Sequence, residues 1–160
     1  MIYLKSVSLS APQRNEEKKV KSNLTVGLSA TRNIEVDTGR TIDFLGESLR
    51  VYATPALVWD FEFACREFLL DYVDAGEDSV GKGISLSHDG ATLRGMNVEL
   101  TVTVSKIEGR LVTFSLLAKD EIEKISEGTH SRFVVDVEKL RTRVAAKAAK
   151  AGKIPTPKGS

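Results

Sequence analysis

The chain contains a single cysteine, Cys65, and two histidines, and this scarcity excludes several classes of protein. One cysteine cannot form an internal disulfide framework, so a small disulfide-held fold is excluded and a reducing compartment is expected. The cysteine and the histidines do not form a cluster with metal-ligand spacing, so no resident metal is expected. We therefore expect Cys65 to be structural.

Long apolar runs and a surplus of charge of one sign are also missing. No stretch reaches the ~18 apolar residues that a membrane span needs, and the N-terminus lacks a continuous signal-peptide core. Lys and Arg number 23 against 22 Asp and Glu, so the net charge of +1 draws the chain to neither nucleic acid nor membrane. We expect a cytoplasmic protein without either partner, whose function depends on a local site.

Several enzyme motifs are absent as well. No Gly-rich loop joins a strand to a helix, and there is no G-x-S-x-G elbow. At 160 residues the chain suits one domain that buries about two thirds of its unfolded surface. We expect a partly mobile N-terminal extension over 1–22, a folded domain over 23–143, and a basic helical end with a disordered tail over 144–160.

What the sequence does contain is a long apolar helix, predicted over residues 54–73. Thr54 suits the N-cap and Pro55 the first helical position. Asp60 is predicted on a wet face with three other carboxylates, whereas Glu62 falls on the apolar side, where an ionisable group needs a reason. The apolar arc includes Trp59, Phe61, Phe63, Phe68 and Leu70.

The rest of the folded part reads mainly as sheet. Apolar and polar residues alternate strictly over residues 96–105, which is the clearest strand. This order predicts an α+β hotdog fold, in which an antiparallel sheet wraps around one long central helix. The other predicted elements are strands at 23–36, 80–88, 111–119 and 124–137 and a short basic helix at 138–151.

The positions of Thr54, Glu62 and His88 can each be explained by a purely structural role as well as by a function. Thr54 could be a cap worth about 1 kcal/mol, or the helix N-terminus could hold a carbonyl oxygen as negative charge develops on it. Glu62 could be an ion pair with Arg66 at i+4 or a functional carboxylate, and the spacing leaves both open. His88 could be a satisfied core histidine.

Two further points concern the last strand and the geometry of the helix. His130 and Arg132 stand close together on that strand, and the default for Arg132 is an exposed position or a partner of Asp136. Thr54 and Glu62 are eight residues apart, about 12 Å along a helix. A site that uses both must be elongated or completed by a second subunit.

Separated blocks of the sequence together resemble one known family, the hotdog acyl-CoA thioesterases typified by fluoroacetyl-CoA thioesterase. The blocks are ATPALVWDFEFAC at 53–65, residues 80–104, EGR at 108–110 and ISEGTHSRFVVD at 125–136. The resemblance implies a homodimer, or a higher oligomer, that hydrolyses a small or medium acyl-CoA to the free acid and CoA. CoA would be part of the substrate, and no separate cofactor is implied.

The resemblance also implies a role for particular residues. Thr54, Glu62 and His88 match the family's catalytic set, with Glu62 either a nucleophile or the group that orients water. Gly81 and Arg132 match positions that contact the acyl-CoA.

The sequence departs from the type enzyme, and other functions compete with hydrolysis. The type enzyme has aromatic lid residues shortly before the threonine, whereas residues 45–50 contain none, and Pro55 replaces a glycine. The family therefore supports thioester chemistry more strongly than any one acyl group. The main alternative is a non-hydrolytic acyl-CoA-binding or regulatory hotdog protein. A hydratase and a structural dimerisation module are more distant alternatives.

Overall fold

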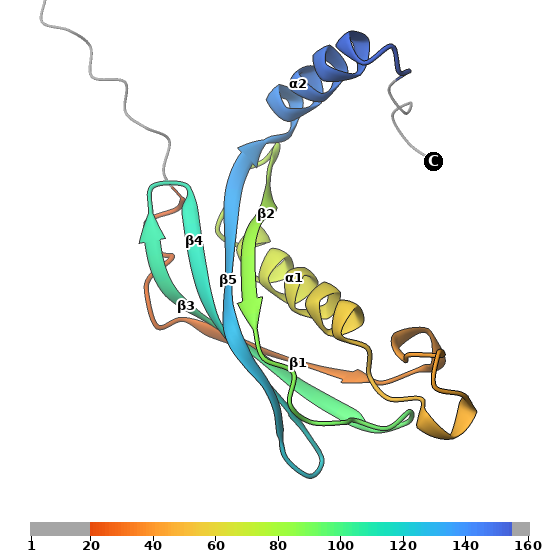
Figure 1. Ribbon diagram of the computed structural model, residues 1–160. Helices are drawn as coiled ribbons and strands as arrows, with labels where there is room; N and C mark the ends of the chain where they lie inside the picture. The colour runs from red at the N-terminus through yellow and green to blue at the C-terminus, as the bar shows by residue number, and fades with distance from the viewer. Residues whose placement is uncertain (1–19, 155–160) are drawn as a thin grey trace, which may run out of the picture.

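The computed structural model describes residues 20–154 (Figure 1). Most of the expected N-terminal extension and the last six residues of the expected tail lie outside the described residues. Residues 20–22, the end of the expected extension, contact the folded part. Val20 packs against the core, and the Lys21 N–H donates to the Tyr72 carbonyl over 3.2 Å.

The described residues form one five-stranded antiparallel sheet in the order β1-β3-β4-β5-β2. The strict alternation predicted around residues 96–105 is confirmed in β3, because every second side chain is buried there. β2 lies at one edge of the sheet and carries an irregularity between Gly81 and Gly83. The strands are β1 Ser29–Glu35, β2 Glu77–Leu86, β3 Asn97–Glu108, β4 Leu111–Asp120 and β5 Lys124–Asp136.

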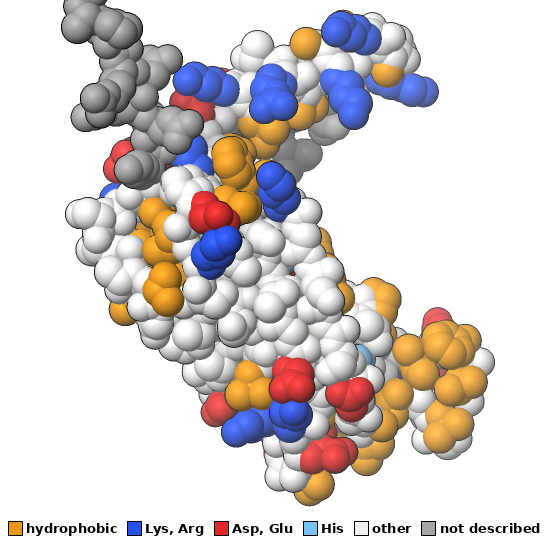
Figure 2. Space-filling model, turned by 60° about the vertical axis from the view of Figure 1, so that its left-hand side comes forward, with side chains coloured by type: hydrophobic (Ala, Val, Ile, Leu, Met, Phe, Trp, Pro, Cys, Tyr) orange, Lys and Arg blue, Asp and Glu red, His pale blue; other side chains and the backbone are white. Residues whose placement is uncertain are grey.

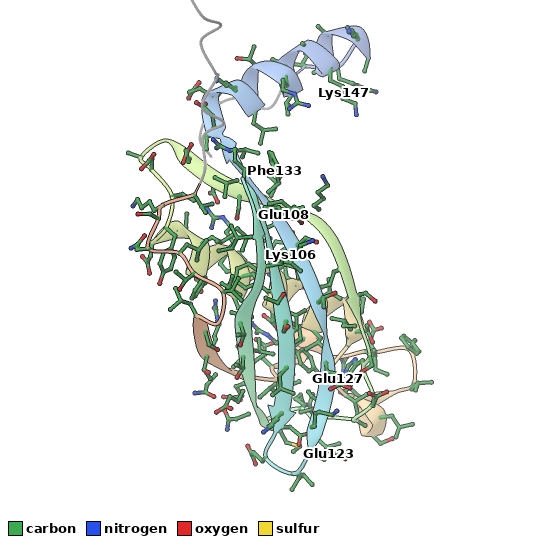
Figure 3. All side chains as sticks on the ribbon, turned by 90° about the vertical axis from the view of Figure 1, so that its left-hand side faces the viewer. Lys106, Glu108, Glu123, Glu127, Phe133 and Lys147 are labelled. Carbon is green, nitrogen blue, oxygen red and sulfur yellow. The ribbon has the colours of Figure 1, made fainter. Side chains whose placement is uncertain are left out.

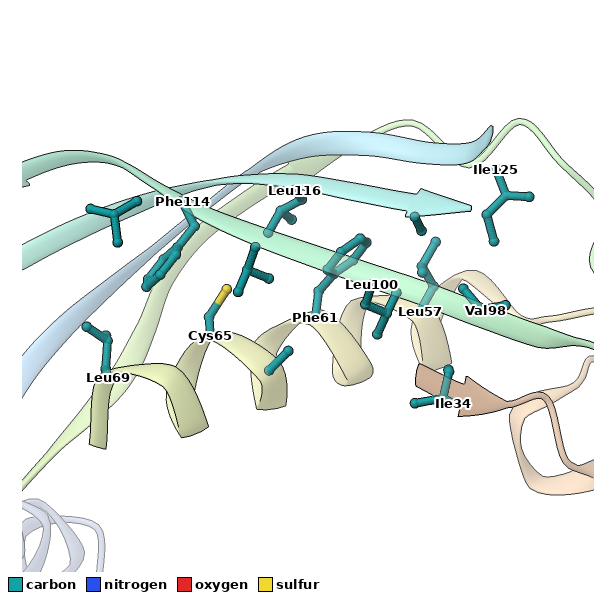
Figure 4. Packing of buried hydrophobic residues seen from close by; sticks show 14 of the residues in the cluster. Ile34, Leu57, Phe61, Cys65, Leu69, Val98, Leu100, Phe114, Leu116 and Ile125 are labelled. Atoms are coloured by element: carbon teal, nitrogen blue, oxygen red, sulfur yellow. The ribbon is translucent and has the colours of Figure 1, made fainter. Parts of the chain in front are cut away.

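One helix, α1 (Thr54–Leu70), lies against the concave face of this sheet (Figure 1). Leu57, Phe61, Cys65 and Leu69 recur every four residues and are all at most 1% exposed. They meet the inward side chains of β3 and β4, among them Leu100 and Phe114 (Figure 4). The α+β arrangement of a central helix and a curved antiparallel sheet is therefore confirmed.

The predicted wet face of α1 is wrong at Asp60. Its carboxylate is only 5% exposed, whereas Trp59, predicted in the apolar arc, is 62% exposed. Asp60 borders the buried stripe on the helix, and its burial is possible because Arg40 and Tyr52 supply hydrogen-bond donors to it. A helical wheel cannot show such partners, since they come from the preceding segment.

Three short elements complete the described chain. η1 (Thr38–Arg40) and η2 (Glu47–Leu49) are 3-10 turns before α1, and α2 (Val137–Lys150) follows β5. α2 buries no residue and projects beyond the sheet, with a row of Lys and Arg side chains along it (Figure 2). Neither α1 nor α2 combines the length and the apolar character that crossing a membrane requires.

Candidate active site

Thr54 begins α1 but does not cap it. The N-cap residue is Ala53, in extended backbone, and no side chain makes a cap hydrogen bond there. Thr54 Oγ1 instead lies 2.9 Å from His88 Nδ1. The interpretation of Thr54 as a cap is therefore wrong, and its hydroxyl belongs to a polar pair at the helix N-terminus, where the first N–H groups have no intrahelical acceptor.

His88 follows β2 and is held from both sides. The Ser87 N–H donates to the Glu127 carbonyl (2.9 Å) and the Asp89 N–H donates to the Ile125 carbonyl (2.8 Å), so β5 fixes the backbone around the ring. The Tyr52 ring meets the imidazole edge to face, with centroids 5.9 Å apart. His88 is therefore presented to Thr54 in a defined orientation.

The second ring nitrogen of His88 has no partner in the described part of the chain. His88 Nε2 is buried and makes no hydrogen bond to any described residue, so the interpretation of His88 as a satisfied core histidine is wrong. Burial lowers the pKa of His88 below its usual value near 6.5, so the ring is neutral at pH 7. A neutral imidazole with an unpartnered nitrogen is suited to accept or deliver a proton.

A cluster of three polar side chains, centred on the buried carboxylate of Asp60, contacts the residues next to the Thr54–His88 pair. Arg40 donates to both Asp60 oxygens, over 2.9 and 3.1 Å, and the Tyr52 hydroxyl donates to Asp60 Oδ2 over 2.8 Å. The Arg40 carbonyl also accepts the Ala53 N–H over 2.8 Å. Arg40 and Tyr52 both bind the Asp60 carboxylate. Through them, this carboxylate is linked to Ala53, which precedes Thr54, and to the ring that packs against His88.

Glu62 lies eight residues farther along α1 and does not pair with Arg66. Arg66 donates to Asp78 instead, over 3.0 and 2.5 Å, so the i+4 ion pair considered from the sequence is wrong. Glu62 Oε1 accepts from Arg132 Nη1 over 3.2 Å, and the Glu62 side chain remains 39% exposed. The carboxylate therefore has one cationic partner and access to solvent.

Gly81 of β2 lies directly against this carboxylate. A Cβ built on Gly81 would stand 2.4 Å from Glu62 Oε1, closer than atoms can approach. Glycine is therefore required at position 81 if Glu62 is to keep its place. This is the physical reason for the glycine in the matched motif.

Arg132 is 2% exposed, so the expectation of an exposed strand position is wrong. It donates from Nε to Ser79 Oγ (2.8 Å) and from Nη2 to the Ser79 carbonyl (2.7 Å), which fastens the guanidinium to β2. Burial lowers its pKa, and Glu62 opposes that shift. His130, beside it on β5, is 3% exposed and contacts Arg132 Nη1 over 3.2 Å.

Cys65 takes no part in this polar arrangement. It is fully buried in the core, and burial raises the pKa of its thiol to about 12. The thiol is therefore protonated at pH 7 and cannot act as a nucleophile. No group of three or more metal-ligating side chains occurs in the part of the chain that the structure describes.

The predicted residues thus fall into two groups. Thr54 and His88 form one, at the N-terminus of α1, and Glu62, Gly81 and Arg132 form the other, under the middle of β2. Between residues 20 and 154 no hydrogen bond joins Glu62 to Thr54 or to His88. Sequence reasoning missed Tyr52, Asp60 and Arg40 as supports, because only the fold brings these three residues together.

Known proteins with a similar chain share this arrangement of helix and sheet. A fluoroacetyl-CoA thioesterase of Streptantibioticus cattleyicolor is 31% identical over 135 residues, which are 80% of this chain and 97% of that protein. A solved structure of the fluoroacetyl-CoA thioesterase FlK is 30% identical with a TM-score of 0.73, covering 79% of this chain and 98% of that one.

More distant structures agree on the fold. A hot-dog-like protein from Thermanaerovibrio acidaminovorans has 26% identity and a TM-score of 0.71, covering 76% of this chain and 91% of that one. This likeness confirms the hotdog fold expected from the order of elements. The profile of the family FlK, fluoroacetyl-CoA-specific thioesterase, matches residues 36–138. The chain therefore belongs to the fluoroacetyl-CoA-specific thioesterase family.

Proposed function

We propose that this protein hydrolyses a small or medium acyl-CoA thioester to the free acid and CoA. The observation that carries the proposal is the Thr54–His88 pair, which leaves a buried ring nitrogen without a partner at the N-terminus of α1. Membership of a thioesterase family names the bond to be broken. The same family membership disfavours a non-hydrolytic binding protein.

The helix N-terminus and Thr54 position the thioester carbonyl in this proposal. The free N–H groups and partial positive charge at the start of α1 stabilise the oxygen as it becomes negative. His88, neutral at pH 7, takes a proton from the attacking water and returns it to the departing sulfur. One C–O bond forms, the C–S bond breaks, and the proton ends on the CoA thiol.

Thr54 and Glu62 of one chain are about 12 Å apart along α1, so in this scheme the Glu62 that acts on a carbonyl held at Thr54 comes from a second copy of the chain. It acts in one of two ways. Its carboxylate either orients the attacking water or attacks the carbonyl itself, forming a mixed anhydride as the C–S bond breaks and the CoA thiolate leaves. In the second case water then cleaves the anhydride to the free acid and the Glu62 carboxylate, and the proton that His88 takes from this water passes to the CoA thiolate. In both cases its oxygen must lie at a fixed place, which Arg132 and the open space at Gly81 provide. Gly81 and Arg132 thereby contribute to substrate binding through the place they give to Glu62, since Arg132 itself is only 2% exposed.

The acyl group is bounded by the segment before α1. Phe44, Leu45 and Leu49 are 76%, 55% and 53% exposed and give this segment an apolar surface, and Val51, which follows them, forms a bridge with Leu93. Such a surface suits an apolar acyl chain or a second subunit. The lone buried thiol of Cys65 supports the further proposal that the protein works in the cytoplasm. We also propose that it needs no separate cofactor, because CoA is part of the substrate.

The test is hydrolysis of a panel of short, branched and aromatic acyl-CoAs, followed by release of the CoA thiol. Wild type is expected to turn over at least one member, and Glu62→Gln and His88→Ala are expected to lose about a hundredfold or more in kcat. Thr54→Val should lose activity without losing stability, because its hydroxyl does not cap α1. A wild type that binds acyl-CoA yet cleaves none of the panel would overturn the proposal.

A further inference from the structure

His130 is a buried histidine that the proposed reaction does not use. It lies on β5 and is 3% exposed. Its Nδ1 is 2.9 Å from the carbonyl oxygen of Gly83 on β2, and its Nε2 is 3.2 Å from Arg132 Nη1. Both ring nitrogens are therefore satisfied, in contrast to His88, whose Nε2 has no partner among the described residues.

The two partners fix the tautomer of His130. A guanidinium can only donate hydrogen bonds, so His130 Nε2 must be an acceptor and carry no proton. A carbonyl oxygen can only accept, so Nδ1 must carry the proton that it donates to Gly83. The ring is thus neutral, with its proton on Nδ1. Burial lowers the pKa of His130, which agrees with a neutral ring.

The charged groups around His130 come from two elements. Arg132 neighbours it on β5, and Glu62 faces it from α1. β2 contributes the Gly83 carbonyl, and the residue opposite on β4 is the uncharged Phe114. Protonation of the ring would place a second cation 3.2 Å from the guanidinium and replace its acceptor with a donor.

Arg132 uses its three nitrogens in different ways. Nε and Nη2 are held by Ser79. Nη1 is the nitrogen that reaches Glu62, with Oε1 at 3.2 Å and the Glu62 carbonyl at 3.3 Å. The same Nη1 is the one that donates to His130. His130 therefore acts on the part of the guanidinium that touches the proposed catalytic carboxylate.

We propose that His130 is a positioning residue for Glu62, because its neutral ring holds Arg132 Nη1 in the place from which it binds the carboxylate. The inference rests on the proposed thioester hydrolysis for its effect on turnover. It gives a role to the histidine that lies two residues before Arg132 in the block ISEGTHSRFVVD at 125–136. It also means that acid acts on the site in two places, at His88 and at His130.

The experiment compares His130→Gln with His130→Ala. Glutamine offers a carbonyl oxygen to Arg132 and an amide N–H to Gly83, whereas alanine offers neither. His130→Ala is expected to lower kcat at least about tenfold and to change KM much less, since a displaced carboxylate harms the chemical step more than binding. His130→Gln should recover most of that loss, and Thr129→Ala, exposed on the same strand, should behave as wild type.

The pH profile separates positioning from general destabilisation. A lowered histidine pKa means that the neutral form, and the activity that depends on it, is lost only as the pH falls below the usual range near 6.5. In wild type both histidines contribute to this acid loss. In His130→Gln only His88 remains, so the acid limb of kcat should become less steep.

A readout independent of turnover is the tautomer of His130, followed by nitrogen NMR of the full-length protein at pH 7. The chain has two histidines, so the resonance lost in His130→Gln identifies the ring. We expect a protonated Nδ1 and a bare Nε2. A ring protonated on Nε2 or on both nitrogens, or a folded His130→Ala with wild-type kcat, would overturn the inference. A wild type without turnover would sink the proposed function, while the tautomer would still decide whether His130 accepts from Arg132.

Discussion

At the scale of single residues, alanine substitutions at three glycines of β2 and β5 distinguish an effect on turnover from an effect on the stability of the fold. An added Cβ meets the mobile end of the Glu62 side chain at Gly81, only Ser131 Oγ at 3.9 Å at Gly83, and the Ser85 carbonyl at 2.2 Å at Gly128. A flexible side chain can move aside, whereas backbone cannot. The three positions therefore have different consequences for the same substitution.

We predict that Gly81→Ala lowers kcat strongly while changing the free energy of unfolding by less than about 1 kcal/mol. The methyl group displaces the Glu62 carboxylate from Arg132 without disturbing the core. Gly83→Ala is the matched control and should retain both activity and stability. Gly128→Ala should cost about 2 kcal/mol or more, because the clash is with backbone. Steady-state kinetics and urea unfolding measure both quantities, and an active Gly81→Ala would remove Glu62 from the mechanism.

At the scale of elements, the buried carboxylate of Asp60 binds the N-terminal half of α1 to Arg40 and Tyr52, in the segment that precedes the helix. The side chain of Asp60 is 6% exposed and has three hydrogen-bond donors, two from Arg40 and one from Tyr52. Glu67, one turn before the end of α1, makes an ion pair with Arg32 at the surface, with side chains 50% and 38% exposed. Both are ion pairs between an arginine and a carboxylate, but the carboxylate of Asp60 is buried and that of Glu67 is exposed.

We predict that Asp60→Ala lowers the free energy of unfolding by about 3 kcal/mol, because it leaves the buried Tyr52 hydroxyl and the partly buried Arg40 guanidinium without their shared acceptor. Glu67→Ala should cost less than about 1 kcal/mol, since solvent replaces an exposed partner. Chemical denaturation of both variants measures the difference. Equal losses would mean that the Asp60 group contributes no more than a surface ion pair.

The same helix shows how far the sequence could predict the site. The apolar stripe of α1 and the alternation in β3 arise from local periodicity, so the fold followed from the pattern. The motif match selected Thr54, Glu62 and His88. The partners of these residues depend on contacts distant in sequence, such as Thr54 with His88 and Glu62 with Arg132. Periodicity carries no information on such pairs, which is why Asp60 was placed on the wrong face.

At the scale of the whole molecule, β2 leaves an open edge on the described chain. It is ten residues long and last in the order of the sheet, with Val80 and Ile84 each 38% exposed. Lys82, which could protect such an edge, lies over the Phe133 ring instead, 5.8 Å from its centroid. Phe133 itself lies near the α2 end of the sheet, away from Glu123 and Glu127 at the other end (Figure 3).

An open edge of this length favours antiparallel pairing of β2 with β2 of a second copy about a twofold axis. The continuous sheet would place the partner's β2 beside Gly81, under which Glu62 lies, and beside the segment that leads to His88. A dimer of this kind would enclose the exposed side of the Glu62 carboxylate. The two groups of site residues would then share one cleft between subunits.

We therefore predict that wild type has about twice the 17.5 kDa mass of the chain in light scattering. Ile84→Glu places a charge in the paired edge and should give a folded monomer with little activity, because the cleft over Glu62 is lost. Ile122→Glu, 82% exposed in the turn between β4 and β5, is the control and should remain a dimer with wild-type kcat. A wild-type monomer with full turnover would show that one chain alone completes the site, and the β2 edge would then need another explanation.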